Sequence, residues 1–133
     1  MKHSIKTLFI LLLLNQTISF AHENLAGKVG TTFKAGNTTE LVKLFDENLE
    51  LVIDSEQVSY FKIANSHAEL ILKNFFKKHP PQDFRIVFQN ENNCLGNYKS
   101  SGENYLVYIQ IKTDVAGKST IQKLHLRKDY QKY

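Results

Sequence analysis

The alternation of apolar and polar residues predicts a series of short strands, with helices before and between them. The clearest strand signal is at residues 105–112, where Tyr105, Val107, Ile109 and Ile111 share one face. Strands with the same character are predicted at residues 49–54, 58–61, 84–89, 95–99 and 120–127. Because short turns join most of these segments, they favour an antiparallel sheet with residues 105–112 at its centre.

Helical spacing of apolar residues predicts three helices. They cover residues 26–34, a short segment after residue 37, and residues 66–78. Asn37 with Glu40, and Ser66 with Glu69, have the spacing of a capping box, in which side chains satisfy the free N–H groups at a helix start. The predicted class is α+β, with the three helices on the concave face of a strongly bent antiparallel sheet.

The first 21 residues have the features of a secretory signal peptide. Lys2 and Lys6 precede the apolar run 8–14, and Ser19 and Ala21 place small residues before an expected cleavage site. That run is too short for a membrane span, which needs about 20 apolar residues. We therefore expect residues 1–21 to be removed. Residues 22–133 would then form one exported domain, periplasmic or extracellular, with no transmembrane segment.

Charge and cysteine content narrow the possible partners. Residues 1–21 hold two of the 17 basic residues and none of the 13 acidic ones, so the remaining chain has a net charge of +2. No basic run is interleaved with aromatic residues, and we predict no nucleic-acid partner. The single cysteine, Cys94, has no partner for an internal disulfide. We interpret it as a buried, unreactive thiol.

The titratable residues do not form a pattern that predicts catalysis. Asp54 falls on the strand face opposite the apolar residues of 49–54, so it is expected to point away from the core. The histidines lack the i, i+4 spacing of a helical metal site, and His79 and His125 are expected at the surface. We therefore predict no catalytic residue, no metal site and no cofactor.

Five short motifs are spread over nearly the whole chain after residue 21. They are Phe-Lys-Ala-Gly-Asn at 33–37, Leu-Phe-Asp at 44–46, Leu-Lys-Asn-Phe-Phe at 72–76, Leu-Gly-Asn-Tyr at 95–98 and Ile-Gln-Lys-Leu at 121–124. Their order resembles that of a family of small secreted bacterial domains of unknown function with the nuclear transport factor 2-like, or cystatin-like, fold. The resemblance implies a cone-shaped domain that commonly forms dimers. It supplies no catalytic residues.

Enzymes of the superfamily that the chain resembles use a pocket between the concave sheet and the helices. Eight residues at expected inward positions are candidates to line such a pocket and to bind a small apolar ligand: Phe45, Leu51, Ile53, Phe75, Phe76, Phe88, Tyr105 and Val107. Two functions stay open. We favour a non-catalytic binding or interaction module. The alternative is a small isomerase-like or hydrolase-like enzyme that uses the same pocket.

The outer face of the central strand predicts self-association. Leu106 and Tyr108 share this face with Gln110 and Lys112, so it is not uniformly polar. A small exposed apolar patch at the centre of a sheet fits a two-fold contact between two identical faces. We therefore expect a homodimer that forms through the outer sheet face at Leu106 and Tyr108.

Overall fold

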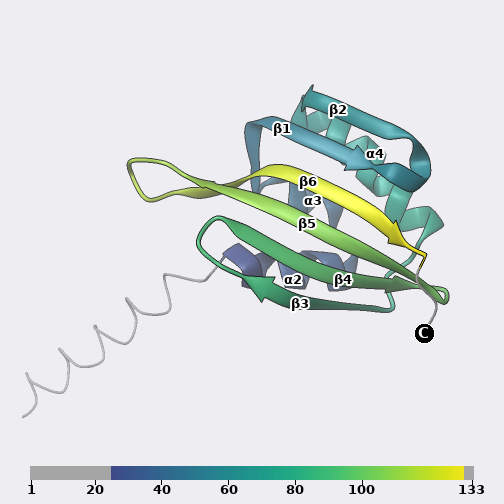
Figure 1. The fold of residues 1–133 in the computed structure, drawn as a ribbon. Helices are drawn as coiled ribbons and strands as arrows, with labels where there is room; N and C mark the ends of the chain where they lie inside the picture. The colour runs from purple at the N-terminus through teal and green to yellow at the C-terminus, as the bar shows by residue number, and fades with distance from the viewer. Residues whose placement is uncertain (1–24, 131–133) are drawn as a thin grey trace, which may run out of the picture.

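A computed structural model describes residues 25–130 of the 133 (Figure 1). The predicted signal peptide, residues 1–21, lies outside the described residues. Within the described part, no helix has the length and apolar character needed to cross a membrane.

The described residues form one curved sheet of six strands (Figure 1). In chain order the strands are β1 (Phe45–Ile53), β2 (Val58–Ile63), β3 (Asp83–Gln89), β4 (Asn93–Ser100), β5 (Glu103–Thr113) and β6 (Ser119–Asp129), with a short 3-10 turn, η1 (Asp54–Glu56), after β1. Their order across the sheet is β2-β1-β6-β5-β4-β3, so β5 is central, as predicted.

The predicted α+β class with a bent sheet is confirmed, and one strand pair adds a feature that the sequence did not indicate. Strands β1 and β6 run parallel, with Leu51 opposite Leu124 and Ile53 opposite Leu126. All other neighbouring strands are antiparallel. Short turns impose antiparallel pairing on the strands that they join. No such turn connects β1 with β6, which lie far apart in the sequence.

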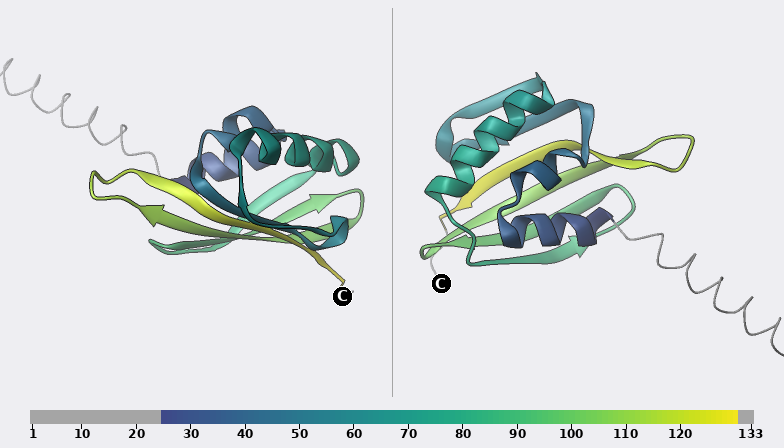
Figure 2. Two further views of the ribbon diagram at one scale, coloured as in Figure 1. Left: turned by 90° about the horizontal axis from the view of Figure 1, so that it is seen from above. Right: turned by 180° about the vertical axis from the view of Figure 1, so that it is seen from behind.

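Three helices cover one face of the sheet, as Figure 2 shows from above and from behind. They are α2 (Leu25–Ala35), α3 (Thr38–Val42) and α4 (Asn65–Lys78). The predicted cap of α3 is present, because the Asn37 side chain accepts a hydrogen bond from the Glu40 backbone N–H at 3.2 Å. The Glu40 carboxylate does not complete a capping box. It pairs instead with Lys43 at 2.8 Å.

The predicted cap of α4 is wrong. The helix begins at Asn65, directly after β2, with Ala64 at the capping position and no side-chain cap. Because the helix starts earlier, Ser66 lies within its first turn and is exposed. The Glu69 carboxylate accepts a hydrogen bond from the Thr39 hydroxyl at 3.3 Å, which links α4 to α3.

The core lies between the helices and the concave face of the sheet. The inward residues predicted for β1 (Leu49, Leu51 and Ile53) and β5 (Tyr105, Val107, Ile109 and Ile111) are all buried. Aromatic side chains from α2, α4, β3 and β4 join them: Phe33, Phe75, Phe76, Phe84 and Tyr98.

Phe88 is an exception to the predicted alternation. We expected it to face inward with Phe84 and Ile86, but the residue is 55% exposed. The pairing of β3 with β4 shifts between Ile86 and Phe88, so one extra residue interrupts the alternation. Beyond that bulge, Phe88 lies outside the core on an edge strand.

Candidate functional site

The interior of the cone, where the resemblance implies a ligand pocket, is filled by side chains. Seven of the eight predicted pocket residues are buried in a single core cluster, and the eighth, Phe88, is exposed. The ring of Phe75 lies 5.3 Å from that of Tyr105 and 5.9 Å from that of Tyr98, measured between centroids. None of the eight residues lines either of the two surface pockets described below.

A polar cluster closes one end of this core around His79. The sequence placed His79 at the surface, but its ring is half-buried between Phe75 and Tyr105, with centroids 5.0 and 5.4 Å away. The His79 Nε2 atom lies 3.2 Å from Glu56 Oε1, and Nδ1 lies 3.6 Å from Glu103 Oε2. The sequence gives no signal for this convergence, because the residues come from η1, the end of α4 and the start of β5.

Two lysines hold the carboxylates of this cluster in their charged form. Lys78 donates a hydrogen bond to Glu56 at 3.1 Å, which lowers the pKa of Glu56. Lys128 donates to Glu103 at 3.0 Å, and the Tyr105 hydroxyl donates to Glu103 at 2.9 Å. These bonds lower the pKa of Glu103. The cluster therefore ties α4, β5, β6 and η1 together by charge-assisted hydrogen bonds.

The two tyrosines of the cluster act as hydrogen-bond donors. Tyr98 donates to the backbone carbonyl of His79, and the Tyr105 hydroxyl also lies 3.2 Å from His79 Nδ1. Burial raises the pKa of both phenols well above the usual range, so both stay protonated near neutral pH. Neither described pocket is lined by a member of the cluster. The geometry of the cluster is better suited to holding the end of α4 in place than to binding a substrate.

We expect the stabilisation that this cluster gives to the fold to weaken at low pH. The folded state lowers the pKa of Glu56, so the stabilisation is present above the ordinary value of 4.5 and is lost as the pH falls through the lowered pKa. Glu56→Gln should remove part of this pH dependence and cost less than about 1 kcal/mol at pH 7, because the ion pair is partly exposed.

Urea melts between pH 7 and pH 3 measure this effect. Glu91→Gln is the matched control, because Glu91 lies on the exposed loop between β3 and β4. If Glu56→Gln and the wild type lose stability in parallel below pH 4.5, Glu56 does not contribute.

The other candidate groups lie apart from this cluster. Cys94 is buried and its pKa is raised by burial, in keeping with an unreactive thiol. His125 points to the outer face, as predicted, and its Nε2 lies 2.7 Å from Glu50 Oε2. Within residues 25–130, no three His, Cys, Asp or Glu side chains are arranged to hold a metal ion.

The outer face of the sheet carries the predicted patch at its centre. Leu106 and Tyr108 are 36% and 37% exposed. Tyr108 lies between Leu95 of β4 and His125 of β6 in the strand register. Its hydroxyl donates to Asn93 Oδ1 at 2.7 Å, which holds the ring in place along the sheet.

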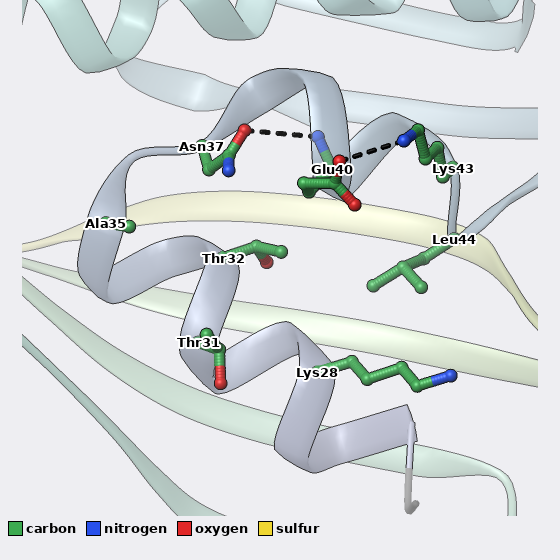
Figure 3. Close-up of a pocket in the computed structure, with 8 residues that line it drawn as sticks. All are labelled: Lys28, Thr31, Thr32, Ala35, Asn37, Glu40, Lys43 and Leu44. Carbon is green, nitrogen blue, oxygen red and sulfur yellow. Dashed lines mark hydrogen bonds and ion pairs between the residues drawn. The ribbon is translucent and has the colours of Figure 1, made fainter.

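A pocket of about 470 Å³ lies on the helical side of the molecule, between α2 and α3 (Figure 3). It is lined by Lys28, Thr31, Thr32, Ala35, Asn37, Glu40, Lys43 and Leu44. A second pocket, of about 570 Å³, lies between α2 and β3. The sequence does not indicate either pocket, since the helical walls taken alone look like solvated helix sides and the β3 wall looks like an ordinary strand. Only the packing of α2 against its neighbours creates the hollows.

Comparisons with known proteins agree on the fold. Residues 26–127 match the model of the DUF4783 family, described as a domain of unknown function. A search of the curated proteins finds no match.

Solved structures are similar over most of the chain. A DUF4783 family protein from Bacteroides ovatus has 22% identity and a TM-score of 0.69, with 78% of this chain and 94% of that chain covered. One from Bacteroides uniformis has 21% identity and a TM-score of 0.70, with 81% and 100% covered. An NTF-2 like protein of unknown function from Silicibacter pomeroyi has 9% identity and a TM-score of 0.55, with 77% and 88% covered. The predicted fold is therefore confirmed, and at these identities the structures show the fold alone.

Proposed function

The chain belongs to the DUF4783 family, and from that premise we propose that it is an exported, non-catalytic interaction module that acts as a homodimer. The features of residues 1–21 support export. The family itself indicates no reaction and no ligand.

The main support for a non-catalytic role is that side chains fill the interior of the domain. An enzyme of this fold needs an open cavity in which titratable groups converge on a substrate. Here Phe75, Tyr98 and Tyr105 are almost completely buried and lie ring against ring in that space. The cluster of titratable groups around His79 directs its tyrosine hydroxyl donors to protein groups, the His79 carbonyl and the Glu103 carboxylate. The interior is therefore better suited to stabilising the fold than to catalysing a reaction.

The outer face of the sheet supports the homodimer. Leu106 and Tyr108 lie on the central strand β5, so a two-fold axis near them would bring each patch onto its copy. Charged pairs border the patch on one side: Arg127 with Asp54 at 3.2 Å, and His125 with Glu50 at 2.7 Å. An apolar centre with a polar rim is the usual arrangement of a protein interface.

Leu106→Asp is expected to convert the dimer into a monomer that stays folded. The substitution places a charge in the apolar centre of the contact, whereas the Leu106 side chain does not enter the core. Light scattering at tens of micromolar gives the mass, and circular dichroism reports on the fold.

The matched control is Val87→Asp, which changes an exposed apolar residue on the edge strand β3 and should leave the dimer intact. A wild-type chain that has a monomer mass at these concentrations would refute the dimer. Equal dissociation by both variants would place the contact elsewhere.

A further inference from the structure

We propose that the pocket between α2 and α3 binds a small amphiphilic carboxylate, a short apolar body that ends in a carboxylate group. The pocket, at about 470 Å³, falls within the range of small-molecule sites, roughly 300–1,000 Å³. The inference rests on the proposed role as a binding module, but it concerns the helical side of the molecule and not the outer sheet face (Figure 2).

The charged groups of the pocket favour an anion. Two lysines and one glutamate line it, so its net charge is positive. Lys28 forms no ion pair within the described residues. Lys43 pairs with Glu40 at 2.8 Å, but both side chains are more than half exposed, at 64% and 51%. Such an exposed pair is weak, so Lys43 can exchange Glu40 for a ligand carboxylate at little cost.

The rest of the lining favours an apolar body next to that anion. The hydroxyls of Thr31 and Thr32 donate to the backbone carbonyls of Gly27 and Val29, at 3.0 and 2.9 Å. Both hydroxyl donors are therefore engaged within α2, and the two threonine side chains present their methyl groups to the pocket. Leu44 adds an aliphatic side chain from the opposite wall.

Figure 3 shows how these groups are placed. Thr32 and Leu44 face each other across the space between the two helices, and Lys28 extends from α2 along the side on which Leu44 lies. A carboxylate near Lys28 would leave its apolar chain over Leu44 and the threonine methyl groups. A highly hydrated anion such as phosphate would leave that apolar wall uncovered.

The test is a titration of the ¹⁵N-labelled chain without its predicted signal peptide, followed by NMR, with sodium octanoate up to about 20 mM at pH 7. We expect saturable shifts centred on the amides of Thr31, Thr32 and Leu44. Octylammonium, which has the same tail and the opposite charge, should bind at least about threefold more weakly. Absence of saturable shifts, or equal binding of the two amphiphiles, would overturn the proposal.

Three variants locate the site. Lys28→Gln should weaken octanoate binding about three- to fivefold, whereas Glu40→Gln should strengthen it, because Lys43 is released. The matched control is Lys34→Gln, on the same helix but in the lining of the other pocket, and it should have no effect. Equal weakening by Lys28→Gln and Lys34→Gln would refute this site. The molecular mass measured in the same samples tests the homodimer independently, so the two proposals fail separately.

Discussion

Replacing Phe75 with alanine is expected to lower the free energy of unfolding by about 3–5 kcal/mol. Phe75 lies on the inner face of α4 and is 1% exposed. Its ring packs edge-on against Tyr105 and Phe76, with centroids 5.3 and 5.8 Å away, and also contacts His79. The substitution therefore leaves a cavity at the point where α4, β5 and the polar cluster meet. Urea-induced unfolding measures the change directly.

Leu70→Ala is the matched control on the same helix. Leu70 is 60% exposed, so its truncation should change stability by less than about 0.5 kcal/mol. If Phe75→Ala costs less than about 1 kcal/mol, the inner face of α4 has been assigned wrongly.

The sequence predicts the inward residues well where the alternation is uninterrupted. In β5, Tyr105, Val107 and Ile109 all face inward, because a one-residue shift would expose all of them together. Strand β3 differs, because a bulge before Phe88 reverses the alternation there. A bulge depends on how the edge strand pairs with its neighbour, and no local residue pattern predicts it here.

Contacts between distant segments could not be predicted. His79 follows α4 and looks like a surface residue in the sequence, yet Glu56 and Glu103 meet it from segments about 20 residues away on either side. Lys28 and Lys43 look like solvated helix positions, and only the packing of α2 beside α3 brings them to one pocket. The motifs identify the fold, whereas the candidate sites depend on side-chain placement that the motifs do not specify.

Gly96 packs directly against the ring of Phe84, a role that its sequence context does not indicate. It lies on β4, between Ile86 of β3 and Val107 of β5 in the strand register. A Cβ atom at this position would lie 2.4 Å from Cζ and 2.5 Å from Cε2 of Phe84. The Phe84 ring is itself held by stacking on Phe33, with centroids 4.8 Å apart.

Gly96→Ala is therefore expected to destabilise the fold by about 1–3 kcal/mol, because the added methyl group must displace a buried ring that has little room to move. Urea melts give the cost, with Gly27→Ala as the matched control. Nothing lies within 4 Å of a Cβ at Gly27, which is in α2. Since alanine favours a helix over glycine by about 1 kcal/mol, that control should be neutral or stabilising.

A double-mutant cycle tests whether the cost of Gly96→Ala comes from the Phe84 ring. In a Phe84→Leu background the smaller side chain leaves space for the added methyl group, so Gly96→Ala should cost at least about 1 kcal/mol less than it does in the wild type. The same cost in both backgrounds would mean that the contact with Phe84 is not what requires glycine at position 96. The strand backbone next to Arg85 would then be the better explanation, since its carbonyl oxygen lies 3.3 Å from the added Cβ atom.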